Sequence, residues 1–145
     1  MKKEIILKKI TKNDYDFLYE LLKSRDSRTN ISHKSMPTYK EHVKFIESKP
    51  YKSWYIIIFE TSQIGSIYLS KQDEIGIFIL QNFHDIGLGQ LALDELININ
   101  PCERYLANVN PKNSKSIKFF EKNNFKLIQH TYELVGRKKS NETKN

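Results

Sequence analysis

Two glycines separated by one residue, Gly87 and Gly89, stand between a polar turn and an apolar helical pattern. Before them, the residues from Glu74 to Leu80 carry alternating apolar side chains rich in β-branched types, which predicts a strand. After them, apolar residues recur at helical spacing as far as Ile97. A strand, a glycine-bearing loop and a helix N-terminus bring together unpaired backbone N–H groups and the positive end of the helix dipole, and this arrangement suits a phosphate.

The glycine pair also has a simpler interpretation, a tight turn that lets the helix pack closely on its neighbours. The stretch lacks the Lys-Ser/Thr pair of a P-loop and the third glycine of a dinucleotide-binding loop. A phosphate site at this loop therefore needs support from a second motif elsewhere in the chain.

Length and composition bound the class of protein. The chain has 145 residues and one cysteine, which predicts a single domain over residues 1–136, no disulfide framework and a cytoplasmic location. The net charge of +7 favours an anionic partner, although part of it lies in a basic tail, residues 137–145, that we expect to be disordered. The N-terminal apolar run is too short for a signal peptide or a membrane span, so no membrane partner is expected.

The remaining patterns predict the elements that must position the loop. Strands are expected at residues 4–10, 54–59, 64–70, 74–80, 105–109, 125–128 and 131–135. Helices are expected at residues 15–22, 37–49, 87–98 and 114–122, with Asn13 or Asp14 capping the first and Asn113 the last. The order βααβββαβαββ contains three hairpin-linked strands and then a crossover, which predicts an α/β fold with a mixed sheet and helices on both faces.

The second motif lies in residues 113–125 (NSKSIKFFEKNNF). Residues 84–89 (HDIGLG) resemble the Gln/Arg-x-x-Gly-x-Gly/Ala loop of the GCN5-related N-acetyltransferases (GNAT), and residues 113–125 resemble that family's second signature. In that signature an Asn opens a helix, a small residue follows three positions later, and an aromatic-Glu-Lys-x-Gly-Phe ending leads into a strand. The resemblance covers residues 4–135 and implies a GNAT-like sheet splayed between its fourth and fifth strands.

The resemblance implies that acetyl-CoA is the cofactor. Its diphosphate would lie on the loop's backbone N–H groups, and its pantetheine arm would pair like an extra strand with the end of the strand at residues 74–80. Side chains of the last helix would reach the arm from the other side. The implied cofactor-binding residues are Ile79, Leu80, His84, Asp85, Ile86, Gly87, Leu88, Gly89, Gln90, Asn113, Ser116 and Phe120.

Three residues depart from the family pattern. His84 stands in place of Gln or Arg; a histidine can still donate to a phosphate, but its grip would be weaker or pH-dependent. Asn124 stands where a Gly usually closes the helix, and Asn tolerates the left-handed conformation required there. Phe120 stands where many members have the Tyr that protonates the leaving thiolate, so that acid is absent here.

Acetyl transfer needs an uncharged amine held near the thioester carbonyl and a donor for the developing oxyanion. We expect the donor to be a backbone N–H near Leu80. Glu74 is the expected base, acting through water, and its alternative interpretation is a solvated turn residue. Glu41 and Asp73 are weaker candidates for the base. No cluster of residues has the spacing that zinc ligands need, so no metal is expected.

Other reactive side chains have ordinary structural interpretations. His33 and His42 are expected at the surface, with contact to substrate as the alternative. Tyr132 is a weak candidate to replace the missing acid, and Cys102 is expected to be incidental. The lysines of the last helix are expected to be solvated, with the cofactor 3′-phosphate as an alternative partner: Lys115, Lys118 and Lys122.

We therefore expect an N-acetyltransferase that transfers the acetyl group of acetyl-CoA to a primary amine of a small molecule by direct attack in a ternary complex. Residues 41–46, 54–59, 63–65 and 74–76 loosely resemble members that acetylate nucleotide-linked amino sugars. Protein or peptide amines, polyamines and aminoglycosides remain alternatives, as does a non-catalytic acyl-CoA-binding module. The basic residues lack interleaved aromatic residues, which argues against nucleic acid, and both a monomer and a homodimer remain open.

Overall fold

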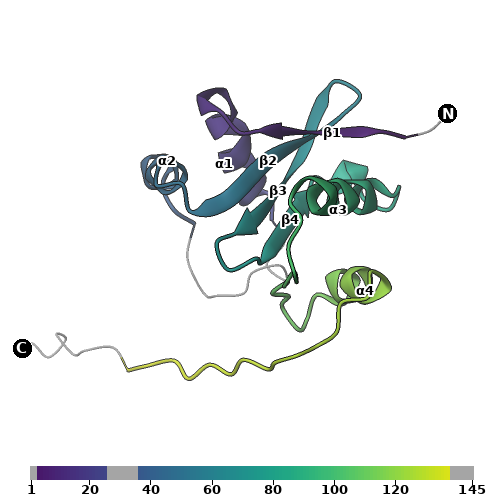
Figure 1. Ribbon diagram of the computed structural model, residues 1–145. Helices are drawn as coiled ribbons and strands as arrows, with labels where there is room; N and C mark the ends of the chain where they lie inside the picture. Colours follow the sequence, from purple (N-terminus) through teal and green to yellow (C-terminus); the bar gives the residue numbers. More distant parts are fainter. Residues whose placement is uncertain (1–2, 26–35, 138–145) are drawn as a thin grey trace, which may run out of the picture.

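The computed structural model describes residues 3–25 and 36–137 (Figure 1). His33 and nearly all of the basic tail therefore lie outside the described residues. The elements in chain order are β1 (Ile5–Lys9), the 3₁₀ helix η1 (Lys12–Asp14), α1 (Tyr15–Lys23), α2 (Tyr39–Glu47), β2 (Tyr51–Phe59), β3 (Ser62–Ser70), β4 (Ile75–Ile79), the 3₁₀ helix η3 (Gln81–Phe83), α3 (Leu88–Ile99) and α4 (Ser114–Lys122).

An antiparallel sheet with strand order β1-β2-β3-β4 forms the centre of the molecule. One of its middle strands, β2, contains the continuous apolar run of the sequence, residues 54–59, and such a run is typical of a strand that is buried on both faces. Ile56 and Ile57 of β2 point to opposite faces, and both are fully buried. The sequence patterns therefore predicted the first four strands and their hairpin pairing.

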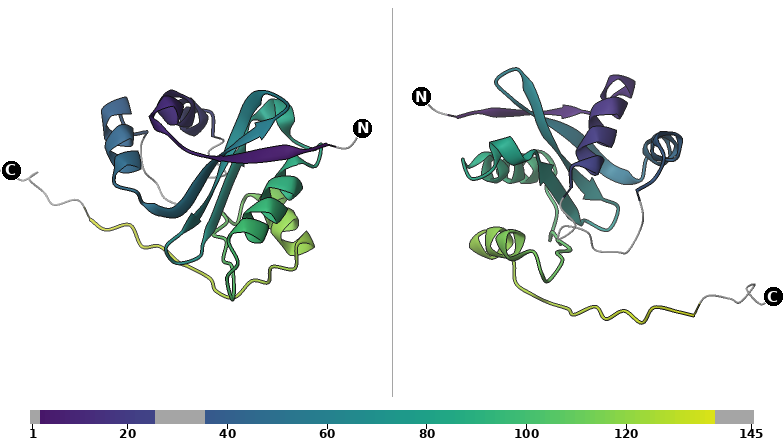
Figure 2. Two further views of the ribbon diagram at one scale, coloured as in Figure 1. Left: turned by 45° about the horizontal axis from the view of Figure 1, so that its top comes forward. Right: turned by 180° about the vertical axis from the view of Figure 1, so that it is seen from behind.

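Helices cover both faces of the sheet (Figure 2). On one face, Ile57 and its neighbours form a cluster with Leu88, Leu93 and Leu96 of α3. On the other face, Ile56 packs against Leu18 of α1 and Ile46 of α2. The expected α/β architecture with helices on both faces is confirmed. No helix in the described ranges is long and apolar enough to cross a membrane.

β4 meets the segment at residues 105–109 at one point and then separates from it. The N–H of Ile75 donates to the carbonyl of Leu106 at 2.7 Å, and the N–H of Leu106 donates to the carbonyl of Asp73 at 2.9 Å. These bonds make a parallel bridge between Glu74 and Leu106. The expected fifth strand is thus reduced to one bridge, and the sheet is open beside the rest of β4.

The two closing strands predicted at residues 125–128 and 131–135 do not form, so this part of the predicted order is wrong for the single chain. The residues run as an extended chain from the end of α4, with no ladder partner within the described ranges (Figure 1). Apolar alternation gives a segment the propensity for a strand, but a strand also requires a neighbour to pair with.

Polar side chains fix the helix ends. Asn113 caps α4 as expected, because its Oδ1 accepts the N–H of Ser116 at 3.1 Å. At the first helix, Asp14 holds the N-cap position of α1 as expected, although its side chain makes no capping hydrogen bond to that helix. The side-chain cap belongs to the preceding 3₁₀ helix η1, where Thr11 is the N-cap and Asp14 completes a capping box by accepting the Thr11 N–H at 2.7 Å. Asn124 adopts a φ of 70°, which confirms the left-handed conformation expected there.

Candidate active site

The loop before α3 leaves the N-terminus of that helix open to solvent. Gly87 is the N-cap residue, with a φ of 88°, and no side chain caps the helix. A Cβ at Gly87 would meet no atom within 4 Å, so glycine is favoured there by the left-handed backbone and not by crowding. The first N–H groups of α3 have no intrahelical partner, and they lie at the positive end of the helix dipole, next to the exposed residues 85–87. This geometry fits a phosphate.

Gly89 lies in the first turn of α3, close to β4 and α4. A Cβ there would lie 3.6 Å from the Phe119 ring and 3.7 Å from Cδ1 of Ile79, which is ordinary van der Waals contact. Alanine would therefore fit at this position. A longer side chain would enter the space between β4 and α4, beside the N-terminus of α3.

Two side chains that were expected to hold phosphate have other partners. Nε2 of His84 donates to the carbonyl of Ile79, and its Nδ1 faces the Lys115 ammonium at 3.3 Å. The amide of Gln90 exchanges hydrogen bonds of 2.6 and 3.0 Å with Asn123, and so it links α3 to α4. The Gln90 side chain is therefore engaged by α4, and only its backbone N–H, in the first turn of α3, is left as a possible phosphate donor.

Lys115 brings a cation to the same loop. Its ammonium lies 3.0 Å from a carboxylate oxygen of Asp85, and both side chains are exposed. Asp85 and Ile86 are themselves exposed, while Leu88 is buried in the core under α3. The loop therefore combines backbone donors with one neighbouring lysine, as an anion site in contact with solvent requires.

The open edge of β4 offers backbone groups to the gap. In an antiparallel ladder, alternate residues direct their N–H and C=O groups away from the neighbouring strand. The N–H of Leu80 donates to Ile64 at 2.8 Å, so the predicted oxyanion donor at Leu80 is committed to β3. The register places Ile77 and Ile79 at the outward positions. The N–H groups that face the gap are therefore those of Ile77 and Ile79.

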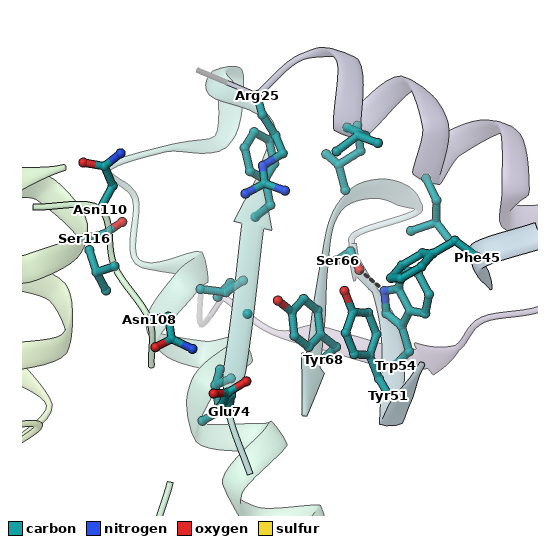
Figure 3. A pocket seen from close by; sticks show the side chains of 18 of the residues that line it. Arg25, Phe45, Tyr51, Trp54, Ser66, Tyr68, Glu74, Asn108, Asn110 and Ser116 are labelled. Carbon is teal, nitrogen blue, oxygen red and sulfur yellow. Dashed lines mark hydrogen bonds between the residues drawn. The ribbon is translucent and has the colours of Figure 1, made fainter. Parts of the chain in front are cut away.

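A cavity of about 670 Å³ runs from α1 and α2 across the edge of β4 to α4 (Figure 3). Aromatic rings form one side of it: Phe45, Tyr51, Trp54 and Tyr68. The rings of Tyr51 and Tyr68 stack with centroids 3.7 Å apart. A Cβ at Gly76 would overlap the Tyr68 ring, so glycine allows that ring to lie across β4.

Charged and amide side chains face the same cavity. The guanidinium of Arg25 lies over the Phe78 ring, 5.6 Å from its centroid. Asn108 and Asn110 lie on the opposite wall, as Figure 3 shows. Glu74 lies at the bridge where the strands part. The cavity therefore offers a cation, a carboxylate and amide groups around an aromatic surface.

His42 of α2 lines this cavity and is not the surface residue that we expected. It is only 7% exposed, and its Nε2 is buried without a hydrogen-bond partner in the described part of the chain. Burial lowers the pKa of His42 below its ordinary 6.5, so the ring is neutral at pH 7. A buried nitrogen without a partner is unfavourable, and a bound molecule in the cavity would relieve this cost.

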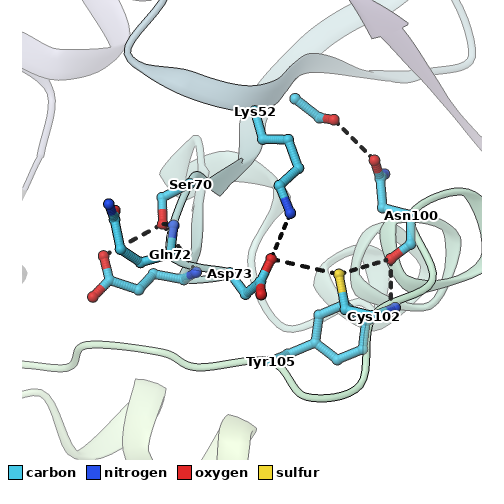
Figure 4. A network of polar contacts seen from close by, with 9 residues as sticks. Lys52, Ser70, Gln72, Asp73, Asn100, Cys102 and Tyr105 are labelled. Atoms are coloured by element: carbon cyan, nitrogen blue, oxygen red, sulfur yellow. Dashed lines mark hydrogen bonds and ion pairs between the residues drawn. The ribbon is translucent and has the colours of Figure 1, made fainter.

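A polar network holds the turn that leads into β4 (Figure 4). The Lys52 ammonium lies 2.6 Å from Asp73, and its hydrogen bond lowers the pKa of that carboxyl group. The thiol of Cys102 lies 3.6 Å from the same carboxylate, which makes Cys102 part of this network. The Glu74 N–H donates to Oγ of Ser70 at 3.0 Å. The network fixes the position of Glu74 at the mouth of the gap.

The three carboxylates considered as the base have different surroundings. Asp73 is engaged by Lys52, and Glu41 caps α2 by accepting the Thr38 N–H at 2.8 Å. Glu74 is half-buried, lines the cavity and has only the Ser70 hydroxyl, at 3.4 Å, near its Oε1. Of the three, Glu74 is the one directed to the cavity without a charged or backbone partner among the described residues.

Phe120 lines the cavity where the family's tyrosine is expected, and it packs against Phe119 and Phe125. Asn113 and Ser116 line the same wall, so all three C-terminal residues of the predicted cofactor set lie together. Tyr132 is 89% exposed and does not line the cavity, so it is not placed to replace the missing acid. No metal-binding group of three His, Cys, Asp or Glu residues occurs within the described ranges.

Sequence reasoning missed the aromatic side of the cavity and Arg25. Trp54 belongs to a continuous apolar run, in which periodicity does not tell which face borders a cavity. Tyr68 belongs to an alternating strand, and alternation does not tell which of its two faces lies beside a cavity. Arg25 follows the last turn of α1, where the sequence reads as a loop. The one available signal was the pairing of Gly76 with a bulky aromatic on the neighbouring strand.

Comparisons with known proteins agree with this geometry. The sequence matches the family model of the acetyltransferase (GNAT) domain over residues 4–126. No curated protein matches the sequence. Among solved structures, a domain from Methanocaldococcus jannaschii DSM 2661 is 26% identical with a TM-score of 0.75, covering 91% of this chain and 94% of that chain.

Two further structures share the fold. An N-acetyltransferase from Staphylococcus aureus Mu50 is 20% identical with a TM-score of 0.69, covering 85% of this chain and 84% of that one. The aminoglycoside N-acetyltransferase AAC(6')-Iy, solved in complex with CoA, is 15% identical with a TM-score of 0.68, covering 94% and 97%. Acetyl-CoA is the co-substrate of the family. The chain therefore belongs to the GNAT acetyltransferase family and is an N-acetyltransferase.

Proposed function

We propose that the protein acetylates a primary amine by direct attack, with acetyl-CoA and the acceptor bound together on opposite sides of the parted strands. The observation that carries this proposal is the continuous cavity past the edge of β4. One end is lined by α1 and α2, and the other by α4 and residues 108–110. Two molecules entering from the two ends would meet at the edge of β4.

The cofactor end is assigned to backbone donors and one cation. The N–H groups of residues 88–90 and the ammonium of Lys115 would hold the diphosphate. The outward N–H of Ile79 would pair with the pantetheine arm. On the α4 side, Oδ1 of Asn113 is occupied as a cap, which leaves its Nδ2 and the Ser116 hydroxyl for the arm. When bound, acetyl-CoA supplies an activated acetyl thioester.

We assign the oxyanion donor to the N–H of Ile77. Ile77 lines the cavity, whereas Ile79 and Leu80 do not. It lies three residues from Glu74, about 10 Å along the strand. A donor at this position would stabilise negative charge that develops on the carbonyl oxygen, close to where an amine enters from the α1–α2 end.

Glu74 would act as the base. An amine is mostly protonated at neutral pH and must lose that proton before it attacks. Glu74 accepts the proton through water, and Ser70 and the turn at Asp73 keep the carboxylate at the mouth of the gap. With Phe120 in place of the tyrosine, the leaving thiolate takes its proton from solvent.

For the acceptor, we propose a nucleotide-linked amino sugar. Sugar and base rings stack well on aromatic surfaces, and the cavity presents stacked Tyr51 and Tyr68 beside Trp54. Arg25 provides a cation for phosphate on the acceptor side, and the net charge of +7 favours an anionic molecule over a polycation. A polycationic acceptor would face Arg25 with like charge.

A panel of amines tests the proposal. We expect free thiol to be released from acetyl-CoA with UDP- or CMP-linked amino sugars, at higher kcat/KM than with polyamines, aminoglycosides or peptides. Release with a peptide or polyamine alone would contradict the acceptor class. Thermal stabilisation by acetyl-CoA with no thiol released by any amine would instead identify a non-catalytic binding module.

A further inference from the structure

The face of β4 that borders the cavity lacks one side chain. Side chains alternate along a strand, so Glu74, Gly76 and Phe78 share this face, and all three line the cavity. The first offers a carboxylate and the third a ring, whereas the glycine between them offers only its backbone. The space above Gly76 is therefore available to a side chain from a neighbouring strand.

Tyr68 of β3 fills this space. It is the ladder partner of Gly76, and a Cβ at Gly76 would overlap the end of its phenol at Cε2, Cζ and the hydroxyl oxygen. The hydroxyl group thus lies directly over the backbone of β4, and Figure 3 shows it directed to that strand. Along β4 this position lies between Glu74, the proposed base, and the N–H of Ile77, the proposed oxyanion donor.

Neighbouring rings hold the phenol in place. The Tyr51 ring stacks on that of Tyr68 at 3.7 Å, and the Trp54 ring meets Tyr51 edge-on at 4.7 Å. Trp54 is itself held by a hydrogen bond of 2.7 Å from its Nε1 to Oγ of Ser66. Burial, and then the Tyr68 hydroxyl beside it, raise the pKa of Tyr51 well above its ordinary 10, so Tyr51 keeps its proton and donates a hydrogen bond to the Tyr68 oxygen.

The Tyr68 hydroxyl has bonding capacity left for a bound molecule. A phenol hydroxyl has two acceptor lone pairs and one donor. Tyr51 takes one lone pair, which leaves the second lone pair and the O–H for groups that enter the cavity within the described part of the chain. An amine that attacks at the edge of β4 needs an acceptor for one of its N–H groups, so that its own lone pair is turned to the thioester carbonyl.

We propose that the Tyr68 hydroxyl binds the attacking amine: its oxygen accepts one N–H of the amine, and its O–H donates to the water that carries the amine's proton to Glu74. The inference rests on the proposed direct attack. The hydroxyl lies at the edge of β4, where the two ends of the cavity meet, so it should act on every primary amine and not on one class of acceptor.

Tyr68 keeps its own proton throughout the reaction. The ammonium first gives one proton through the water to the Glu74 carboxylate and becomes a neutral amine. The C–N bond then forms as the C–S bond breaks, and the sulfur leaves as a thiolate that takes its proton from solvent. The nitrogen loses a second proton to solvent as the amide forms, and the N–H that Tyr68 accepts stays on the product.

Tyr68→Phe removes the hydroxyl and keeps the ring. We expect kcat for thiol release with a UDP-linked amino sugar to fall about tenfold, an effect of the size that one hydrogen bond contributes. The Kd of acetyl-CoA should not change. As a matched control, Tyr55→Phe removes a phenol hydroxyl of β2 that accepts from Asn100 at 3.2 Å outside this cavity. It should keep kcat within about twofold of the wild type, because the reaction does not use that hydroxyl.

Gly76→Ala tests the space above the glycine. The new methyl group would overlap the phenol and displace it, so kcat should fall by about tenfold or more. In a Tyr68→Ala background no ring remains to be displaced, and Gly76→Ala should then change kcat by less than about twofold. Losses that multiply in the double variant would show that the glycine acts independently of Tyr68, which would contradict the inference.

A deaminated acceptor separates contact with the amine from a role in shaping the cavity. The probe is the same sugar nucleotide with hydrogen in place of the amine, used as a competitive inhibitor. Tyr68→Phe should leave its Ki unchanged, because the hydroxyl contacts only the amine and its water. If another amine of the panel is the better acceptor, the same variants are compared with that amine and its deaminated form.

The outcomes distinguish this inference from the proposed function. An unchanged kcat in Tyr68→Phe would overturn the inference and leave the direct-attack proposal standing. A Ki for the deaminated probe that rises as much as kcat falls would do the same, because it would assign Tyr68 to the shape of the cavity. Absence of thiol release by the wild type with every amine of the panel would overturn both.

Discussion

The proposed cofactor end of the site is built mainly from backbone that lies outside the cavity lining, whereas the proposed acceptor end is a cavity wall of side chains. At the cofactor end, the assigned donors are N–H groups of residues 88–90 and of Ile79, and Gly87 supplies the left-handed backbone that begins the helix. At the second end, Arg25, His42 and an aromatic wall define the shape and charge. Backbone groups are the same for every residue type, so one end can be recognised from a short motif while the other cannot.

Because the proposed phosphate donors are backbone groups, the side chain at position 84 does not have to hold the phosphate, and a histidine is tolerated there. Its ring does not face the anion site but bonds to the carbonyl of Ile79 and faces Lys115. A family position usually held by Gln or Arg here stabilises the loop that presents the backbone donors. Changes at the cofactor end should therefore affect binding of acetyl-CoA with any acceptor, and changes at the acceptor end should affect only particular amines.

Gly89→Asp should have the largest effect. The carboxylate would enter the space beside the N-terminus of α3 and repel the diphosphate, and like charges in contact cost several kcal/mol, or about 1,000-fold in Kd. An acidic residue in the first turn favours the helix itself, so the variant should fold. Calorimetry with acetyl-CoA measures the loss. Gly89→Ala, whose Cβ would make only ordinary contacts, should bind within a few-fold of the wild type. If Gly89→Asp bound acetyl-CoA as tightly as the wild type does, the N-terminus of α3 would not be the diphosphate site.

Glu74→Gln should lower kcat by about 100-fold, the usual contribution of a positioned base. The loss should be greatest at low pH, where most of the acceptor amine is protonated and needs the base. Thiol release measured across pH, with acetyl-CoA affinity as the control, checks this prediction. Asp73→Asn changes a carboxylate engaged by Lys52 and should leave the shape of the pH profile intact. An unaltered profile in Glu74→Gln would exclude Glu74 as the base.

Arg25→Gln should raise KM by about 30-fold for acceptors that carry phosphate, because hydrogen bonds to charged groups are worth about 2 kcal/mol. Amines without an anionic group should be affected much less, and acetyl-CoA affinity should not change. Steady-state kinetics with a sugar nucleotide and a neutral amine measure the ratio. A uniform loss with both acceptors would assign Arg25 to the fold and not to recognition.

His42→Phe should have the smallest effect on catalysis and a measurable effect on stability. Replacing the nitrogen that has no partner should raise the acceptor KM about fivefold through the loss of one neutral hydrogen bond. Because burial lowers the pKa of His42, the unfolded state binds the proton more readily, and the wild type loses stability as pH falls below 6.5. The Phe variant should lose less stability over that range in denaturant unfolding. A higher KM together with unchanged acid sensitivity would show that the ring is not buried in its neutral form.

Local sequence patterns were sufficient to predict part of the fold and part of the candidate site. Alternating and continuous apolar runs predicted β1 to β4, and the spacing around Leu88 and Ile117 predicted α3 and α4, because these elements are specified by local patterns. The residues of the cofactor end were named for the same reason. The capping box at Thr11 was not predicted, because Thr11, Asn13 and Asp14 are all residue types that cap helices, and only the folded chain shows which of them makes the side-chain bonds.

The acceptor end and the C-terminus depend on tertiary contacts. Whether Trp54 or Tyr68 borders a cavity is decided by what packs on each face of the sheet, and a continuous apolar run leaves this open. The closing strands were predicted from alternation at residues 125–135, but a strand forms only where an edge is available to it. Our proposal moves the oxyanion donor expected near Leu80 to Ile77, because the Leu80 N–H bonds to Ile64 and the strand period of two directs the N–H groups of Ile77 and Ile79 to the gap.

Hydrogen exchange of individual amides with and without acetyl-CoA tests the central claim most directly. The account predicts slower exchange at Leu88, Gly89 and Gln90, and at Ile77 and Ile79, when acetyl-CoA is added without an acceptor. Leu80, already bonded to Ile64, should be unchanged and serves as the internal control. Saturation of the protein by acetyl-CoA with no added protection at the start of α3 and along the outer edge of β4 would contradict the account.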